Sequence, residues 1–385
     1  MNKKKRKISV TTGTRSEYGL LKPVLKEIVC SKNLDLSLIV TGMHLSKKFG
    51  MTINEIKNDG FKIHSIVDMI PKKDTNFYMS QSLGTGIMQF SKIFNKLKPD
   101  INVILGDRDE AFASALAASH MNIINAHIHG GEKSKAGIDE YNRHAITKIS
   151  NLHFAATKKS CTRIIKMGEN PKWVFHTGSP GIDDVISHNF SSKNILEKKL
   201  GITITGNEII LLQHPITSQP EKTKTEIKNS LNAIVKTNLP TIIIAPNSDA
   251  GNQSIFDEIK IFSKKYSFIN FFRNISRDDF LGLLAHCKVL VGNSSAGMIE
   301  ASYFPISVIN IGIRQDKREH GSNVNTVKSD SDLIFKAIQN SIKNQPKTKH
   351  KKSQIYGNGN ASKKIIQILE KTNLNSDLLQ KQIFY

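Results

Sequence analysis

The segment IINAHIHGGEKSKAGIDEYNRHAITK, residues 123–148, contains the features that decide the fold of this chain. Its apolar start at residues 123–128 predicts a buried strand, and HIHGGE at residues 127–132 places two histidines and two glycines at the end of that strand. A helix is expected over residues 139–150, with Asp139 and Arg143 on one face. Ordinary ion pairs along the helix and a glycine turn without a function would also account for these residues. The segment by itself therefore leaves a purely structural interpretation open.

The same alternation of apolar strands and amphipathic helices continues on both sides of this segment. Strands are expected at residues 8–12, 34–40, 62–67, 101–105, 123–128, 152–156 and 173–177. Helices are expected at residues 18–28, 46–58, 87–97, 110–119, 139–150 and 160–167. Alternation at this spacing is typical of βαβ units, which build a parallel sheet covered by helices on both faces.

A mostly polar run at residues 187–192 interrupts the alternation, and we place an interdomain linker there. Beyond it, strands are expected at residues 209–213, 241–245, 269–272, 289–291 and 306–311. Helices are expected at residues 222–237, 254–265, 278–287, 296–303, 332–342 and 361–370. The sequence therefore predicts an α/β protein with two doubly wound, Rossmann-like halves of similar size.

Composition restricts the class of protein. With 385 residues, 38% hydrophobic and 23% charged, the chain has the make-up of a globular protein of roughly two to three domains. No window approaches the ~18 apolar residues of a membrane helix, and we recognise no signal peptide. The three cysteines are scattered and form no CxxC pair, which fits a reducing compartment. We expect a cytoplasmic protein that does not bind membranes.

The charge balance points to anionic partners. The chain carries 55 basic and 33 acidic residues, a net charge of +22. The excess is mostly lysine and is spread along the chain, with clusters such as residues 3–7 and 347–352. No zinc-finger spacing, aromatic RNA-binding strand or arginine-rich helix accompanies it. We therefore expect no nucleic-acid partner and look for a small anionic ligand.

Polar or charged residues with Gly or Pro follow eight of the expected strands. In open α/β sheets, ligands bind beyond the carboxyl ends of the strands, so eight such turns together indicate one cleft between two facing sheets. These turns are residues 13–18, 42–44, 106–108, 129–132, 214–215, 246–251, 292–297 and 312–314.

The turn at residues 292–295, GNSS, leads straight into an expected helix and would suit a phosphate, although a plain serine N-cap is the simpler alternative. The chain lacks GxxxxGK[ST] and GxGxxG, so neither a P-loop nor a dinucleotide site is indicated. Arg15, Arg108 and Arg314 could hold a diphosphate in bidentate fashion, though each alone could be a surface ion-pair partner.

His127, His129 and Glu132 are candidate metal ligands, because alternate strand residues share a face and both imidazoles could ligate. No second cluster with a known ligand spacing completes a coordination shell. We expect no bound metal and no other cofactor.

With these residues in place, the chain resembles the hydrolysing UDP-N-acetylglucosamine 2-epimerases of sialic acid and related nonulosonic acid pathways. The resemblance runs nearly end to end. It rests on TGTRSEY at residues 12–18, VTGMHL at 40–45, GDR at 106–108, HIHGGE at 127–132, IDE at 138–140, RHAITK at 143–148, QHPIT at 213–217, PNSDAG at 246–251, GNSS at 292–295 and IYGNGN at 355–360.

The resemblance implies the two-domain fold of many nucleotide-sugar glycosyltransferases (GT-B-like), with both domains facing a central cleft. On that basis we expect one domain at residues 1–185, a nucleotide-binding domain at residues 186–358, and a C-terminal helical segment, residues 359–385, packed back on the first domain. It also implies a homodimer.

The reaction implied by the family converts UDP-N-acetylglucosamine to N-acetylmannosamine and UDP. A base removes the C2 proton, UDP leaves from C1, and water adds to the resulting glycal with inversion at C2. Matching positions give catalytic roles to Asp107, Asp139 and His214, with Arg143 in the same proton-transfer set. The other positions carried over are Arg15, Arg108, Ser294, Ser295 and Arg314 for the diphosphate, and Asn247, Asp249 and Glu300 for the sugar or nucleoside.

One departure affects the expected substrate. Some family members read HIEGGE where this chain has His129, so either His129 replaces the carboxylate as the base, or Glu132 or Asp139 does that work. We hypothesise that His129 faces the sugar, as would fit a nucleotide-linked 2,4-diacetamido-2,4,6-trideoxyhexose of the legionaminic acid pathway. A glycosyltransferase on the same scaffold, a non-hydrolysing epimerase and a non-catalytic sugar-nucleotide sensor remain alternatives.

Overall fold

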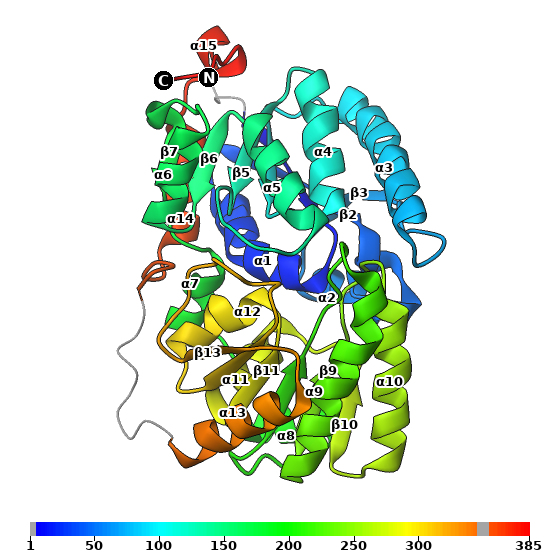
Figure 1. The fold of residues 1–385 in the computed structure, drawn as a ribbon. Helices are drawn as coiled ribbons and strands as arrows, with labels where there is room; N and C mark the ends of the chain where they lie inside the picture. Colours follow the sequence, from blue (N-terminus) through cyan, green and yellow to red (C-terminus); the bar gives the residue numbers. More distant parts are fainter. Residues whose placement is uncertain (1–4, 345–353) are drawn as a thin grey trace.

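The computed structural model describes residues 5–344 and 354–385 as two stacked α/β halves, the first at the top of Figure 1 and the second below it. The lysine cluster predicted at residues 347–352 lies outside the described residues, as do residues 1–4. Each half is built on one parallel sheet, which confirms the predicted fold class.

The first sheet has seven strands in the order β3-β2-β1-β4-β5-β6-β7, all paired in parallel. The strand order reverses beside β1, which is the signature of a doubly wound sheet. Its strands are β1 (Arg6–Thr12), β2 (Leu34–Thr41), β3 (Ile63–Val67), β4 (Ile101–Leu105), β5 (Ile124–Ile128), β6 (Leu152–Ala155) and β7 (Val174–His176).

The second sheet has six parallel strands in the order β10-β9-β8-β11-β12-β13, again doubly wound. Its strands are β8 (Ile209–Leu212), β9 (Thr241–Ile244), β10 (Ile269–Phe272), β11 (Val289–Gly292), β12 (Ser307–Ile311) and β13 (Val324–Val327). The central strands are buried along their whole length because helices cover both faces.

Alternate residues of each strand feed separate cores on the two faces of its sheet. In the first half, α1 (Arg15–Cys30) covers one face, and α3 (Asn76–Leu97) and α4 (Asp109–His120) cover the other. In the second half, α8 (Lys193–Leu200) and α11 (Arg277–His286) pack opposite α9 (Thr223–Thr237), α10 (Asn252–Lys265) and α13 (Ser331–Lys343). The remaining helices are α2 (Ile53–Asn58), α5 (Ile138–Lys148), α6 (Lys158–Lys166), α7 (Gly181–Ile186), α12 (Ser295–Met298), α14 (Ala361–Lys371) and α15 (Ser376–Leu379).

The last part of the chain returns to the first half, where α14 packs against α1 (Figure 1). Ile365 and Leu369 are fully buried in the same core as β1 and α1. Asp183 caps the start of α14 by accepting hydrogen bonds from the amides of Ala361 (3.0 Å) and Ser362 (2.8 Å). The domain limits proposed from the sequence stay a prediction. Ile182 and Val185 of α7, which precede the proposed limit at residue 185/186, pack in a core of the second half.

Three local predictions are wrong. The helix expected over residues 46–58 is one 3₁₀ turn at Lys47–Phe49 followed by the short α2, because Gly50 adopts φ +93° and ends that turn. The helix expected over residues 296–303 is α12 followed by a separate 3₁₀ turn at Glu300–Tyr303. Strand β13 and helix α8 were not expected, since neither carries a clear apolar period.

Membrane crossing by a helix is not indicated in the part of the chain that the structure describes: none of its helices combines the necessary length with the necessary apolar character.

Candidate functional site

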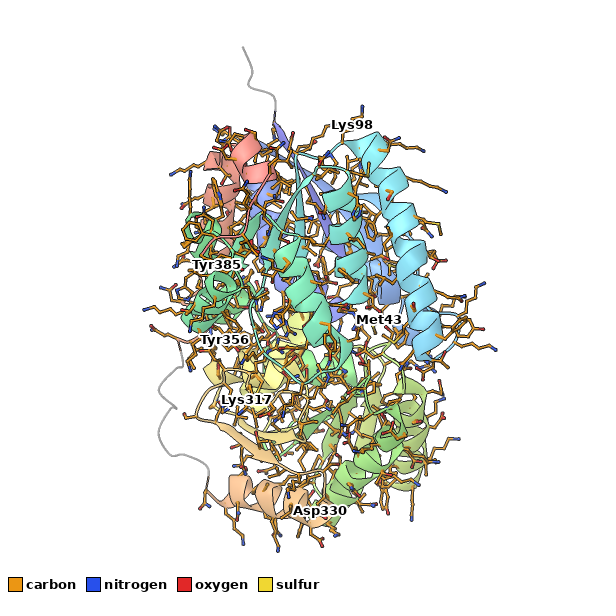
Figure 2. The ribbon with its side chains drawn as sticks, turned by 45° about the horizontal axis from the view of Figure 1, so that its top comes forward. Met43, Lys98, Lys317, Asp330, Tyr356 and Tyr385 are labelled. Atoms are coloured by element: carbon orange, nitrogen blue, oxygen red, sulfur yellow. The ribbon has the colours of Figure 1, made fainter. Side chains whose placement is uncertain are left out.

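A cavity lies between the carboxyl ends of the two sheets, where the turns predicted from the sequence meet. Met43, which lines it, appears in Figure 2 at the level where the two halves join. Ten of the predicted site residues line this cavity: Arg15, Asp107, Arg108, Asp139, His214, Asn247, Ser294, Ser295, Glu300 and Arg314. The other four, His129, Glu132, Arg143 and Asp249, do not line it, although Arg143 pairs with Asp107 and Asp249 pairs with Arg108.

One part of the cavity gathers cations and hydroxyl groups. Arg15 lines it and makes no side-chain hydrogen bond or ion pair with any of the described residues, so its guanidinium is available to a ligand. Ser294 and Ser295 lie at the start of α12, and the Ser294 hydroxyl accepts a hydrogen bond from the amide of Ala296 (3.4 Å). Ser294 is therefore an N-cap residue, which was the simpler alternative to a phosphate site. Helix α12 has only four residues and is too short to contribute much dipole.

Arg108 joins the two halves across the cavity. Its Nη1 donates to Asp249 Oδ1 (3.2 Å), its Nη2 to Ser248 Oγ (3.1 Å), and its Nε to Glu110 Oε2 (3.2 Å). Asp249 therefore pairs with an arginine that lines the cavity but does not line the cavity itself.

Asp107 is held by a buried arginine. Arg143, which is 1% exposed, pairs with the Asp107 carboxylate and with Glu140 Oε2 (2.8 Å). Its Nη1 also donates to Ser134 Oγ (3.3 Å). Arg143 thus fixes the direction of Asp107 without lining the cavity itself.

Asp139, the first acidic residue of α5, stands in different surroundings. Its Oδ2 accepts a hydrogen bond from Arg314 Nη2 (3.2 Å), which belongs to the second half. Burial, and next the charge of Asp249, raise the pKa of Asp139 to about 7, while Arg314 and Arg108 act in the opposite direction. This carboxyl group is therefore poised to change protonation near neutral pH.

His214 follows β8 and is held as a neutral imidazole. Burial, and next the charge of Arg314, lower its pKa to about 3. The amide of Asn247 donates to its Nδ1 (3.1 Å), so the ring proton lies on Nε2. His214 can therefore donate one hydrogen bond into the cavity.

The hypothesis that His129 faces the sugar is wrong for this structure. The residue adopts φ +65° directly after β5 and does not line the cavity. Its Nδ1 pairs with Glu132 Oε1 (2.8 Å) and its Nε2 with Ser179 Oγ (2.9 Å). Arg318, with His129, lowers the pKa of Glu132 to about 2 although burial opposes this, so Glu132 is the ionised anchor of a buried network.

The two histidines of this turn are engaged by other groups of the protein. His127 is fully buried, and its Nε2 lies 2.7 Å from the carbonyl oxygen of Gly106. No group of three or more His, Cys, Asp or Glu side chains that could hold a metal occurs in residues 5–344 and 354–385.

Sequence reasoning missed two cavity-lining residues, Glu17 and Arg277. Glu17 Oε2 accepts the amide of Gly13 (2.6 Å), its Oε1 is buried without a partner, and burial raises its pKa to about 8. Arg277 pairs with Glu300 Oε1 (2.8 Å), so the predicted sugar or nucleoside contact Glu300 is already engaged. Glu17 belongs to the polar turn predicted at residues 13–18, which was the available signal.

Known proteins resemble this chain in sequence and in fold. Residues 26–370 match the family model described as UDP-N-acetylglucosamine 2-epimerase. A UDP-N,N'-diacetylbacillosamine 2-epimerase (hydrolyzing) from Legionella pneumophila is 37% identical over 98% of both chains. A UDP-N-acetylglucosamine 2-epimerase from Neisseria meningitidis is 34% identical and covers 87% of each chain.

Solved structures show the same fold. The crystal structure of UDP-GlcNAc 2-epimerase from Neisseria meningitidis bound to UDP-GlcNAc superposes with a TM-score of 0.80 at 20% identity, covering 95% of this chain and 100% of that one. The Methanocaldococcus jannaschii enzyme in complex with UDP-GlcNAc and UDP gives a TM-score of 0.79 at 20% identity, with the same coverage. On the match of its sequence over nine-tenths of its length, this chain belongs to the UDP-N-acetylglucosamine 2-epimerase family.

Proposed function

We propose that the chain is a hydrolysing 2-epimerase whose substrate is a UDP-linked 2,4-diacetamido-2,4,6-trideoxyhexose. The observation that carries this proposal is the cavity, whose lining combines several carboxyl groups, among them Asp107 and Asp139, with a neutral imidazole and several arginines. The choice of sugar rests on the Legionella pneumophila relative, which is named for UDP-N,N'-diacetylbacillosamine, a sugar of this class, and matches 98% of this chain.

The sugar expected first from the sequence, N-acetylglucosamine, is the second candidate. The Neisseria meningitidis relative is named for UDP-N-acetylglucosamine, but it is 34% identical over a smaller share of the chain. Both substrates present the same C1 and C2 atoms, so the chemistry below applies to either.

The reaction has two parts. A base removes the proton at C2, the C1–O bond breaks, and UDP leaves with the bonding electrons, which gives a C1=C2 double bond in the sugar. Water then adds its oxygen to C1, and an acid delivers a proton to the opposite face of C2. The products are UDP and the free 2-epimeric sugar, and no electrons are gained or lost.

The carboxyl groups of Asp107 and Asp139 lie in different surroundings. We use this difference to assign each of them to one of the two proton transfers. Asp107 pairs with buried Arg143, so we assign it as the base at C2. Asp139, whose pKa is raised to about 7, is assigned as the acid that returns the proton. His214, with its proton on Nε2, is assigned to hydrogen-bond the sugar or the departing oxygen.

The cationic part of the cavity suits the leaving group. Charge builds up on the UDP oxygen as the C1–O bond breaks, and fixed donors in a water-poor site stabilise it. We assign the diphosphate to Arg15, Arg108 and Arg314, with the hydroxyl groups of Ser294 and Ser295 as added donors.

The remaining predicted residues receive supporting roles. Asn247 lines the cavity and is assigned to the sugar or nucleoside, as is Glu300 through its pair with Arg277. Asp249 positions Arg108, while His129 and Glu132 position the turn after β5 through Ser179 and Arg318. A homodimer in the cytoplasm remains a prediction that light scattering and cell fractionation would check.

The substrate is tested by offering purified full-length protein each UDP-sugar separately, without any acceptor, and measuring UDP release. We expect a kcat/KM at least about tenfold higher for the diacetamido sugar, equivalent to about 1.4 kcal/mol of transition-state binding. Equal turnover, or a preference for UDP-N-acetylglucosamine, contradicts the proposed sugar. Turnover that requires an acceptor contradicts hydrolysis.

A further inference from the structure

The pair between Asp139 and Arg314 connects the proton-transfer end of the cavity with its cationic end. Asp139 lies on α5 of the first half, and Arg314 lies on the loop after β12 of the second half, with the two side chains 3.2 Å apart. The amide of Lys135 also donates to the carbonyl oxygen of Arg314 (3.0 Å), so backbone as well as side chain joins the two segments.

We propose that Arg314 couples the bound diphosphate to Asp139, so that an anion at the cationic end of the cavity loads Asp139 with the proton it later delivers to C2. This inference rests on the proposed function and goes beyond it, because it makes a leaving-group contact the regulator of the acid. It identifies Arg314 as a positioning residue toward Asp139 as well as a ligand of the diphosphate.

Arg314 has unused hydrogen-bonding capacity in the buried site. Its Nη1 donates to the carbonyl oxygen of Asn293 (3.3 Å) and its Nη2 to Asp139, while Nε is buried and has no partner. Charge-assisted hydrogen bonds are usually about 2.7–2.9 Å, so both contacts are long. An arginine held loosely, with a free buried donor and next to Ser294 and Ser295 in the cavity lining, is suited to receive an anion.

The four charged groups with the largest effects on Asp139 are two acidic and two basic residues, and Arg318, which also interacts with it, is paired with Glu132. The acidic groups are Asp249 and Asp109, and the basic groups are Arg314 and Arg108. Arg108 is already committed to Glu110 and Asp249 by ion pairs. Arg314 is therefore the cation whose effect on Asp139 an incoming anion would offset most directly.

The sign of the effect follows from this arrangement. Arg314 favours the ionised form of Asp139 and holds its pKa down against burial. A diphosphate beside Arg314 offsets that charge and adds negative charge of its own, so the pKa of Asp139 rises above about 7. Near pH 8, Asp139 should be mostly ionised in the free protein and mostly protonated in the complex, so binding takes up a proton.

The experiment must separate Asp139 from the neighbouring titratable groups. The pKa of His214 is lowered to about 3, so His214 stays neutral at pH 8 with or without an anion. Glu17, with a pKa raised to about 8, lines the same cavity and could contribute uptake of its own. Glu17 and the terminal phosphate of UDP remain in an Asp139→Asn variant, so the difference from wild type isolates Asp139.

The test is titration calorimetry of the full-length protein with UDP near pH 8, repeated in two buffers of different ionisation enthalpy. The dependence of the heat on the buffer gives the number of protons taken up. We expect wild type to take up more protons than Asp139→Asn, by at most about one, while Asp139→Asn still binds UDP. Arg314→Gln should bind UDP at least several-fold more weakly and lose most of this uptake, because its Asp139 is already protonated.

Each alternative result counts against a distinct claim. Equal uptake in wild type and Asp139→Asn overturns the coupling while leaving the proposed function intact. Uptake that persists unchanged in Arg314→Gln overturns the role of Arg314. Failure of wild type to bind UDP overturns the proposed function and this inference together.

Discussion

Asp107 and Asp139 differ in the charged residues that surround them. This difference is the basis for assigning Asp107 as the base and Asp139 as the acid. Asp107 is paired with an arginine that lies within its own half, whereas Asp139 is balanced against an arginine of the other half. The first pairing does not depend on how the halves are arranged, but the second does. On the proposed assignments, proton removal depends on the first half alone, and proton return requires both halves.

We expect Asp107→Asn to lower kcat by about 10²- to 10⁴-fold with little change in UDP affinity, because the base is lost while the diphosphate contacts remain. Glu140→Gln is the matched control, since Glu140 also pairs with Arg143 but does not line the cavity. Steady-state rates of UDP release measure both. A similar loss in the two variants would show that Asp107 acts only by holding Arg143.

The pH dependence of the reaction should report Asp139. Its pKa is raised to about 7, so the protonated acid is present below that pH and is lost as pH rises through it. We therefore expect kcat/KM to fall above about pH 7, and kcat, which reports the substrate complex, to fall at a higher pH. Profiles that rise through neutral pH would instead assign Asp139 as the base.

Single residues also show where sequence reasoning stops. Asp107 and His214 lie on turns directly after strands that the apolar pattern identifies, and Asp139 lies at the start of the helix after β5, so their meeting in one cavity was predictable. The orientation of His129 was not, because it depends on a positive φ and on Ser179, which is 50 residues away in the sequence. Glu17 was missed because a carboxyl group beside a glycine turn has no distinctive spacing.

At the scale of elements, the loop before α3 joins the start of α10 in the other half. Asp74 Oδ1 accepts the amide of Gly251 (2.9 Å) and its Oδ2 accepts the amide of Gln253 (3.0 Å). A carboxylate from one half thus caps a helix of the other, close to the turn that carries Asn247 and Asp249. This contact helps to set the distance between the two walls of the cavity.

Replacing Asp74 by alanine should remove that cap. We expect a loss of about 1 kcal/mol in the free energy of unfolding and a rise of roughly fivefold in KM, with kcat less affected. Lys72→Ala is the control, since Lys72 is exposed on the same loop. Denaturant unfolding gives the free energy of unfolding, and UDP-release kinetics give KM. An unchanged KM in Asp74→Ala would show that the loop carrying Asp74 does not shape the cavity.

The helix α14 should be an integral part of the first half. Leu369 is fully buried beside α1, so Leu369→Ala should cost about 2–5 kcal/mol in the free energy of unfolding. Lys371→Ala, at an exposed position of the same helix, should change it by less than about 0.5 kcal/mol. Equal effects in urea denaturation would mean that α14 does not dock as described.

The sequence predicted those strands and helices whose apolar residues recur with a clear period. The central strands β1, β4, β5, β8, β9 and β11 combine β-branched residues with a short apolar run, and they were placed to within about two residues. The half-buried edge strand β13 alternates too weakly to be recognised and is fixed by pairing with β12. The expected helix at residues 46–58 failed because a left-handed glycine breaks it, which periodicity alone does not reveal.

At the scale of the molecule, two sheets present their carboxyl ends to each other and bring acidic residues of one half against arginines of the other. Besides Asp139 with Arg314, Glu132 pairs with Arg318 across the same boundary. Arg108 of the first half reaches Asp249 of the second. The site is therefore complete only when both halves are in place, which fits a reaction that must hold a diphosphate and a sugar ring at once.

The most direct test of this account is NMR analysis of the products formed from the UDP-linked diacetamido sugar in deuterated water. We predict UDP and a free sugar that has inverted configuration at C2 and carries deuterium there, since Asp107 removes the original proton and Asp139 returns one from solvent. UDP release with the original proton and configuration retained at C2 would contradict the account, because it would mean that no proton is exchanged at that carbon.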